Sequence, residues 1–91
     1  MPKQISITKF IWDKWNKEHI KIHKLKVKEI EEVRFSHFKT KETYEGRIML
    51  FGQTKNKRLL TIVLAPKNSG KFYVVTARDM SKKERKLYQE K

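Results

Sequence analysis

Apolar positions near the start of the chain predict a short strand followed by a helix. The run Phe10-Ile11-Trp12 is typical of a strand, and Asp13 after it is a residue type that caps helices. We therefore expect a helix that begins at Lys14. At about 100° per residue, Trp15, His19, Ile22 and His23 fall on one stripe of this helix, its expected buried face, with Asn16 and Ile20 at the edge of the stripe.

A second helix is predicted from about Val27. Val27, Ile30 and Val33 recur at helical spacing and form its apolar side. Glu29 occupies the position of the acid in a capping box, and Leu25 precedes the helix where it can pack on Ile30. Together these features indicate two consecutive helices in the first third of the chain.

The spacing of apolar residues changes to that of strands in the second half of the chain. We expect strands over residues 44–54, 58–65 and 71–78, joined by a turn at 55–57 and a hairpin loop at 66–70. Ser81 and Glu84 match the S-x-x-E capping box, which predicts a last helix to about Tyr88. The order strand-helix-helix-strand-strand-strand-helix predicts one α+β domain, residues 1–91, with helices flanking a small antiparallel sheet.

Charge adds an expectation about partners. The 91 residues include 23 Lys and Arg against 10 Asp and Glu, a formal net charge of +13. This is well above the magnitude of roughly 2–8 that solubility requires. An acidic partner is therefore expected, either a nucleic acid or an acidic protein. The alternative is a lysine-rich surface that serves solubility only.

Composition also excludes several classes of site. The chain has no cysteine, so disulfides, thiolate nucleophiles and iron–sulfur clusters are excluded. Its three glycines are isolated, which argues against a phosphate-binding loop, and we expect no cofactor. No apolar run approaches the roughly 18 residues of a membrane span, so we expect a cytoplasmic protein without a membrane partner.

His19 and His23 permit three interpretations. They are four residues apart on the predicted helix, which is half of a metal site, but no further ligand lies at a suitable spacing, and we expect no metal. In the second interpretation, they pack against Trp12 and Trp15 as core histidines. The third interpretation is general acid–base chemistry, because an unperturbed imidazole titrates near neutral pH.

The last third of the chain carries the strongest candidate chemistry. Arg78 ends a predicted strand, and Lys82, Lys83 and Arg85 follow on a helix. If that helix packs back over the sheet, Arg78, Arg85 and Tyr88 share a surface with Arg47 and Arg58. Guanidinium groups bind phosphate in a bidentate manner and stabilise a phosphorane more than a diester. The alternative is a solvated basic helix anchored by Leu87 and Tyr88.

Two motifs in this order resemble the BrnT family of toxins from type II toxin–antitoxin systems. The first is Trp12-Asp13 followed by Asn16, His19 and His23, and the second is the stretch VTARDMSKKERKLY. The resemblance covers residues 10–90. It implies a RelE-like fold, ribonuclease activity that inhibits translation, and a partner antitoxin, typically a ribbon-helix-helix protein. It also implies that operator DNA is bound only through the toxin–antitoxin complex.

The chain departs from the family pattern at three positions. Lys24 stands where the family usually has Gly, and Lys26 stands where it usually has a Ser or Thr cap. Asp79 stands where a second basic residue commonly follows the arginine. The last departure removes a cation from the expected active surface.

The resulting hypothesis is a metal-independent endoribonuclease that is neutralised by a cognate antitoxin. The expected catalytic residues are Arg78, Arg85, Glu84, His23 and Tyr88. Arg78 and Arg85 would hold the phosphate, His23 or Glu84 would move protons, and Tyr88 would stack a base or orient Arg85. The expected substrate-binding residues are Arg47, Arg58, Lys82 and Lys83. The alternatives are a non-catalytic basic nucleic-acid-binding protein, an inactive toxin relic, and an adaptor for an acidic protein.

Overall fold

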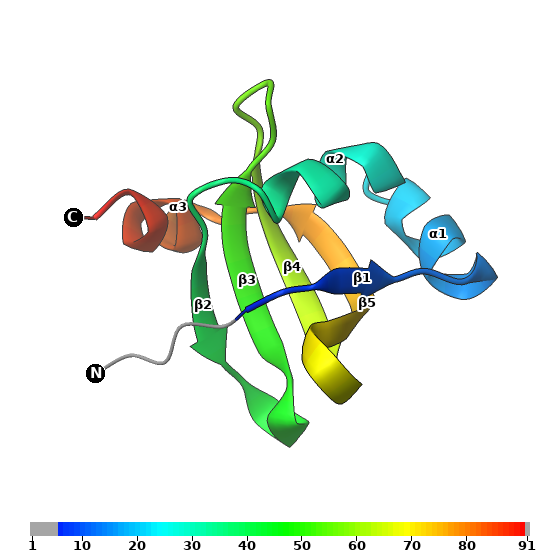
Figure 1. Ribbon diagram of the computed structural model, residues 1–91. Coiled ribbons are helices and arrows are strands. Elements are labelled where there is room, and N and C mark those ends of the chain that lie inside the picture. The colour runs from blue at the N-terminus through cyan, green and yellow to red at the C-terminus, as the bar shows by residue number, and fades with distance from the viewer. Residues whose placement is uncertain (1–5, 91) are drawn as a thin grey trace.

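The computed structural model describes residues 6–90, which form five strands and three helices (Figure 1). In chain order they are β1 (Lys9–Ile11), α1 (Lys14–Lys21), α2 (Val27–Val33), β2 (Lys39–Glu42), β3 (Ile48–Gln53), β4 (Leu59–Pro66), β5 (Lys71–Asp79) and α3 (Lys82–Gln89). Short 3-10 turns, Tyr44–Gly46 and Asn68–Gly70, lie between β2 and β3 and between β4 and β5. The expected α+β class is confirmed.

The strands form one mixed sheet in the order β1-β5-β4-β3-β2. Strands β2 to β5 make the expected antiparallel meander. Strand β1 pairs with β5 in the parallel sense, with Phe10 beside Phe72, so the expectation of an antiparallel sheet is wrong at this edge. A three-residue strand carries no signal for its direction, and a parallel neighbour needs a long connection, which α1 to β4 provides.

Strand β2 was not expected from the sequence. Its residues, Lys39-Thr40-Lys41-Glu42, show no apolar alternation. They lie at the edge of the sheet, where charged side chains are common because they discourage pairing with another chain. Strand β3 is shorter than the predicted 44–54, because Glu45 and Gly46 adopt positive φ values and turn the chain before Ile48. The other two predicted strands and the hairpin loop agree with the structure to within two residues.

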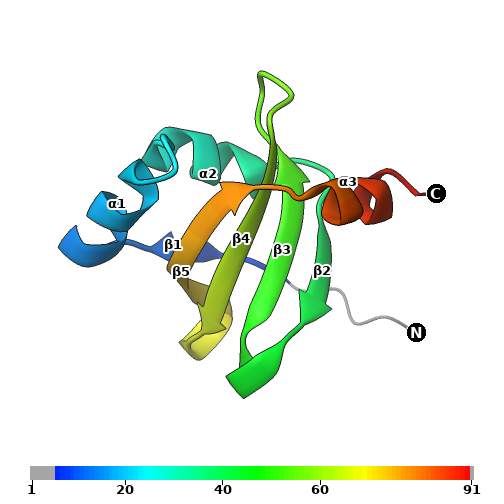
Figure 2. The ribbon, with the colours of Figure 1, turned by 180° about the vertical axis from the view of Figure 1, so that it is seen from behind.

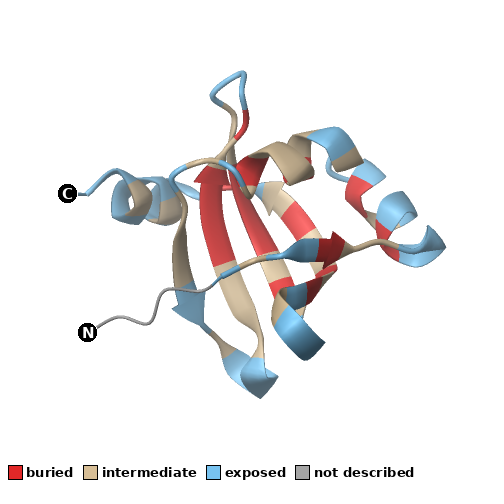
Figure 3. Ribbon diagram, viewed as in Figure 1, coloured by how far each residue is buried: buried red, intermediate tan, exposed pale blue. Residues whose placement is uncertain are grey.

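Helices α1 and α2 lie on one face of the sheet, and α3 lies on the other (Figures 1 and 2). Most strand residues that pack against α1 and α2 are buried, whereas most of α3 is exposed (Figure 3). The sheet side of this core consists of Phe10, Leu50, Leu60, Ile62, Leu64, Phe72, Val74 and Ala77. Ile20 of α1, Leu25, and Ile30 and Val33 of α2 complete it. The sheet is thus packed fully on one face only.

The buried face of α1 differs from the expected stripe. Asn16 and Ile20 are buried, whereas Trp15 is 58% exposed and Ile22 is 70% exposed. The helix ends at Lys21, so Ile22 and His23 lie in the following turn. The amide of Asn16 explains the difference, because its Nδ2 donates to the carbonyls of Ile11 and Val74 at 3.0 Å each. A polar side chain therefore takes the core-facing position and joins β1, α1 and β5.

The predicted helix caps are confirmed. The backbone N–H of Asn16 donates to Asp13 Oδ1 at 2.9 Å, and Asn16 Oδ1 accepts from the N–H of Asp13 at 2.8 Å. This backbone hydrogen bond from Asn16 holds the pKa of the Asp13 carboxyl below its usual value. At α2, the N–H of Lys26 donates to Glu29 Oε1 at 3.0 Å. At α3, the N–H of Glu84 donates to Ser81 Oγ at 3.2 Å.

Candidate functional site

Arg78 and Glu84 form a clamp between the sheet and α3, at the end of the sheet where β5 leads into α3 (Figure 2). Arg78 Nη1 and Nη2 donate to the two carboxylate oxygens of Glu84 at 2.7 and 2.8 Å. Thr61, the residue opposite Arg78 on β4, donates its hydroxyl to Glu84 Oε1 at 2.9 Å. The N–H of Ser81 donates to the same oxygen at 2.9 Å.

The clamp fixes the ionisation of Glu84. The Arg78 guanidinium lowers the pKa of the Glu84 carboxyl to about 2, and the hydrogen bonds from Ser81 and Thr61 act in the same direction. Glu84 in turn raises the pKa of Arg78. A carboxylate with such a low pKa is a weak base and holds no proton to donate at neutral pH. The arrangement makes Glu84 a positioning residue for Arg78.

Arg58 and Asp79 form a second ion pair at the same end of the sheet. Arg58 Nε and Nη2 donate to Asp79 Oδ1 and Oδ2 at 2.8 and 3.1 Å. The same guanidinium donates to the carbonyls of Lys24 and His23, at 3.1 and 3.3 Å, and lies 3.5 Å from Glu29. Arg58 therefore holds the turn between α1 and α2 against the sheet, and its hydrogen bonds lower the pKa of Asp79.

Arg85 on α3 and His23 in the turn after α1 lie at the same end of the sheet as Asp79. After the hydrogen bonds from Arg58, their charges make smaller contributions to the lowered pKa of the Asp79 carboxyl. Both are exposed, and neither makes a side-chain hydrogen bond or ion pair to another of residues 6–90. Arg85 is thus the one arginine at this end of the sheet whose guanidinium has no carboxylate partner among the described residues.

Tyr88 anchors α3 to the far edge of the sheet. Its hydroxyl donates to the carbonyl of His37 at 2.8 Å, and burial raises its pKa. Lys39 of β2 lies 5.9 Å from the centre of its ring and donates to the carbonyls of Leu87 and Glu90. The hydroxyl and one side of the ring are therefore occupied, which fits the alternative interpretation of Tyr88 as an anchor.

The remaining expected binding residues divide into two groups. Lys82 and Lys83 are exposed on the first turn of α3, next to the clamp. Arg47 precedes β3 at the opposite end of the sheet and lies over the ring of Tyr44, 5.9 Å from its centre. At about 3.3 Å per strand residue, it is roughly 20 Å from Arg58 along the sheet. The structure does not bring Arg47 to the surface formed by the other arginines.

The two histidines are not core residues. The ring of His19 stacks on the exposed Trp15 with 4.8 Å between centroids, and His23 approaches His19 edge-on at 6.4 Å. Trp12 instead donates its indole N–H to Glu31 at 2.8 Å. Within residues 6–90, no three His, Asp or Glu side chains gather as a metal site would require.

The sequence did not predict that Thr61 hydrogen-bonds to Glu84 or that Asp79 forms an ion pair with Arg58. Thr61 is the one polar residue inside the apolar run of β4, and this exception was a usable sign of a polar partner on that face. Asp79 was noted only as a lost cation. Its pairing with Arg58 depends on the register of β4 and β5, which brings Asp79 opposite Leu60.

Comparisons of the chain with protein-family models, with curated proteins and with solved structures found no match. In the described part of the chain, no helix has the length and apolar character needed to cross a membrane.

Proposed function

We propose that this chain is a BrnT-like toxin with a RelE-like fold that cleaves RNA where β5 meets α3. The observation that carries the proposal is that Arg58, Arg78 and Arg85 lie at one end of the sheet, where Arg58 pairs with Asp79 and Arg78 pairs with Glu84. Lys82 and Lys83 border this group, which we call the arginine cluster. Such a cluster suits a phosphodiester, and the net charge of +13 favours a polyanionic partner.

In the proposed reaction, a ribose 2′-OH attacks the adjacent phosphorus and the 5′-oxygen of the next nucleotide leaves. The phosphorane carries more negative charge than the diester, so fixed guanidinium groups stabilise it differentially. Arg85 makes no ion pair with a carboxylate of the described residues, so its positive charge is available to the phosphorane. Glu84 holds Arg78 in position. His23 is assigned the removal of the proton from the 2′-OH and the return of a proton to the leaving 5′-oxygen, since Glu84, with a pKa of about 2, is a weak base.

Lys24 gives independent support to the resemblance. Its φ of 58° is left-handed, a conformation that favours glycine, and glycine is what the family usually has there. The backbone at this position therefore suits the family pattern although the residue type departs from it. The other expected partners, a ribbon-helix-helix antitoxin and operator DNA bound through the complex, form part of the same proposal.

A non-catalytic RNA-binding protein, or an inactive toxin relic, is the second candidate. The observation that favours it is the pairing of Arg58 with Asp79 and of Arg78 with Glu84. Each carboxylate neutralises a guanidinium that the reaction would use. This candidate predicts binding of RNA without cleavage.

The first test is cleavage of a 5′-labelled single-stranded RNA by the purified protein in the presence of EDTA. The toxin proposal predicts fragments that end in a 2′,3′-cyclic phosphate, and no cleavage when the 2′-OH at the site is replaced by hydrogen. Arg85→Ala should reduce the cleavage rate by roughly 10²-fold or more. Lys67→Ala, an exposed change in the loop between β4 and β5, is the matched control.

Induced expression in a bacterial host provides the second test. The wild-type chain should arrest growth, the Arg85→Ala variant should not, and co-expression of the product of the adjacent gene should rescue growth. Normal growth with soluble wild-type protein, together with RNA binding but no cleavage in vitro, would establish the second candidate in place of the first.

A further inference from the structure

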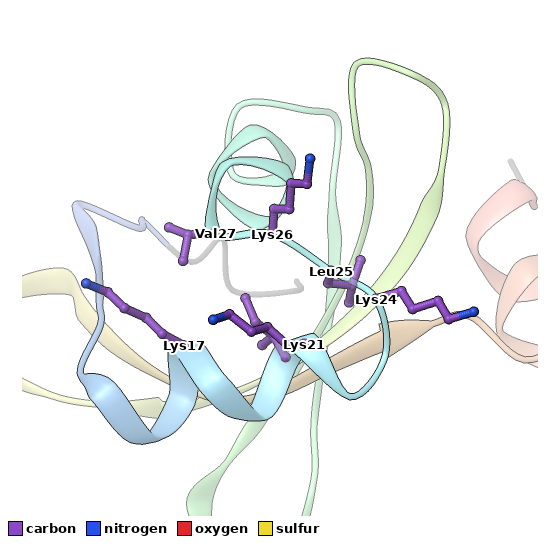
Figure 4. Close-up of a pocket in the computed structure, with 7 residues that line it drawn as sticks. Lys17, Lys21, Lys24, Leu25, Lys26 and Val27 are labelled. Carbon is purple, nitrogen blue, oxygen red and sulfur yellow. The ribbon is translucent and has the colours of Figure 1, made fainter.

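A pocket of about 550 Å³ opens between the end of α1 and the start of α2 (Figure 4). Its apolar wall consists of Ile20, Leu25 and Val27. Four lysines also line it, namely Lys17, Lys21, Lys24 and Lys26. The volume lies in the range of roughly 300–1,000 Å³ that is typical of binding pockets. No acidic residue lines it.

The lysines of this pocket are not explained by contacts within the protein. Within residues 6–90, none of the four has an Asp or Glu partner within salt-bridge distance. Lys21 lies in the last turn of α1, where a cation is favourable next to the helix C-terminus. Neither Lys17 in the middle of α1 nor Lys26 before α2 gains this benefit. In Figure 4, Lys17 and Lys21 extend from α1 toward the side of Val27, Lys26 extends upward from the start of α2, and Lys24 points to the opposite side.

We infer that this pocket docks an acidic amphipathic helix of a partner protein, with apolar side chains on its wall and carboxylates on its lysine rim. Charge complementarity selects the partner, because the lysines that line the pocket make no ion pair within residues 6–90 and can attract carboxylates. An amphipathic helix presents apolar anchors at i, i+3 and i+4 with acidic residues beside them, which matches an apolar wall flanked by cations.

RNA fits this pocket less well. Single-stranded nucleic acids need aromatic platforms for their bases, and no aromatic side chain lines the pocket. The pocket also has no arginine, the residue that binds phosphate in a bidentate manner. The inference does not rest on the proposed cleavage of RNA, because the arginine cluster and the pocket use different side chains.

The test uses a fluorescein-labelled 16-residue peptide with Leu on one helical face and Glu on the other, titrated with the full chain at about 0.1 M salt. Charge reversal of the rim, Lys17→Glu with Lys21→Glu and Lys26→Glu, should weaken binding at least tenfold. The matched control reverses Lys41, Lys67 and Lys71, three exposed lysines on and near β2 and β5, and changes the net charge equally. It should alter binding less than threefold.

A second peptide, in which every Leu is replaced by Ser, keeps the charge and removes the apolar anchors. It should bind at least tenfold more weakly than the first. In ¹⁵N-labelled protein, the amide shifts caused by the first peptide should concentrate at residues 17–27. These two measurements use the unaltered protein, so they do not depend on the folding of a variant.

The inference is overturned if the rim and control variants bind the peptide equally, or if the Ser peptide binds as tightly as the Leu peptide. It is also overturned if a 16-nucleotide single-stranded RNA displaces the peptide and shifts the same amides, since the pocket is then a nucleic-acid site. Loss of RNA cleavage alone leaves these readouts unchanged, which separates this inference from the proposed function.

Discussion

Lys24 adopts the left-handed backbone conformation, with φ of 58°, immediately before the buried Leu25. The turn is closed by hydrogen bonds from the N–H groups of Lys24 and Leu25 to carbonyls in the last turn of α1. An L-residue with a side chain pays a steric penalty of about 1–2 kcal/mol in this conformation, and glycine does not. The chain therefore carries local strain at the junction of its first two helices.

Lys24→Gly should consequently stabilise the protein. We expect a gain of about 0.5–1 kcal/mol after the greater chain entropy of glycine in the unfolded state is included. The measurement is thermal or urea unfolding. Lys28→Gly, which changes the same residue type inside α2, is the control and should instead cost about 1 kcal/mol. Equal losses in both variants would show that the conformation of Lys24 is not strained.

Glu84 predicts a specific dependence of stability on pH. Its pKa falls from 4.5 to about 2 on folding, so its contribution is fully present above pH 4.5 and is lost as the pH drops toward 2. The contribution is on the order of 1–2 kcal/mol, because the partner Arg78 is partly exposed and screened. Glu84→Gln should lower the free energy of unfolding by this amount at pH 7 and leave it unchanged at pH 2.

Glu18→Gln is the control for this measurement, since Glu18 is exposed on α1 and makes no ion pair with another described residue. Its difference from the wild-type protein should stay within about 0.5 kcal/mol at every pH. A Glu84→Gln variant that loses the same stability at pH 2 as at pH 7 would mean that lost packing or hydrogen bonding, not charge, explains the effect.

At the scale of elements, Gly52 determines how closely α2 approaches the sheet. A Cβ atom added there would lie 2.4 Å from Val33 Cγ1 and 2.9 Å from Ser36 Oγ. Gly52→Ala must therefore push α2 and the segment after it away from β3, and overpacking of this kind costs about 1–3 kcal/mol. We expect a lower unfolding midpoint and weaker amide protection in α2 than in α1.

Gly46→Ala separates packing from backbone effects. Gly46 has φ of +72° and no atom within 4 Å of an added Cβ, so its substitution should cost only the left-handed penalty of about 1–2 kcal/mol. The Gly46→Ala substitution should not change the protection of the α2 amides against hydrogen exchange. If both alanine variants lower α2 protection equally, the close approach at Gly52 is not what holds the helix.

Elements with local signals were the ones that the sequence predicted well. Ser81 and Glu84 mark the start of α3, and Glu29 with Ile30 and Val33 marks α2, because caps and apolar spacing act within a few residues. The face of α1 was predicted wrongly because the role of Asn16 depends on carbonyls of β1 and β5, the latter 58 residues away. The same limit applies to the direction of β1 and to the charged edge strand β2.

In the candidate site too, residues that belong to a local motif were predicted, and contacts between distant segments were not. Arg78, Glu84 and Arg85 were identified from one local motif, and the structure places all three at one end of the sheet. The ion pair of Arg58 with Asp79 was not predictable, because it depends on the register of β4 against β5. Arg47 was grouped with them by residue type alone, and the antiparallel register of β3 and β4 puts it at the other end of the sheet.

At the scale of the whole molecule, the net charge of +13 acts over a short range. The chain measures 36 × 28 × 23 Å, whereas the Debye length at physiological salt is about 8 Å. Residues 55–91 hold eleven of the basic residues and three acidic ones. RNA affinity at physiological salt should therefore depend on local pairs in the arginine cluster more than on the total charge.

Asp79→Asn tests this expectation. The change releases Arg58 from its carboxylate partner and should add one phosphate contact, so the slope of log K for single-stranded RNA against log salt should steepen by roughly 0.7. The pair is solvent-exposed, so stability should fall by no more than about 1 kcal/mol. Glu18→Gln raises the net charge equally but lies on α1, and it should leave the slope unchanged. Equal steepening in both variants would mean that RNA responds to the overall charge and that the arginine cluster is not its binding site.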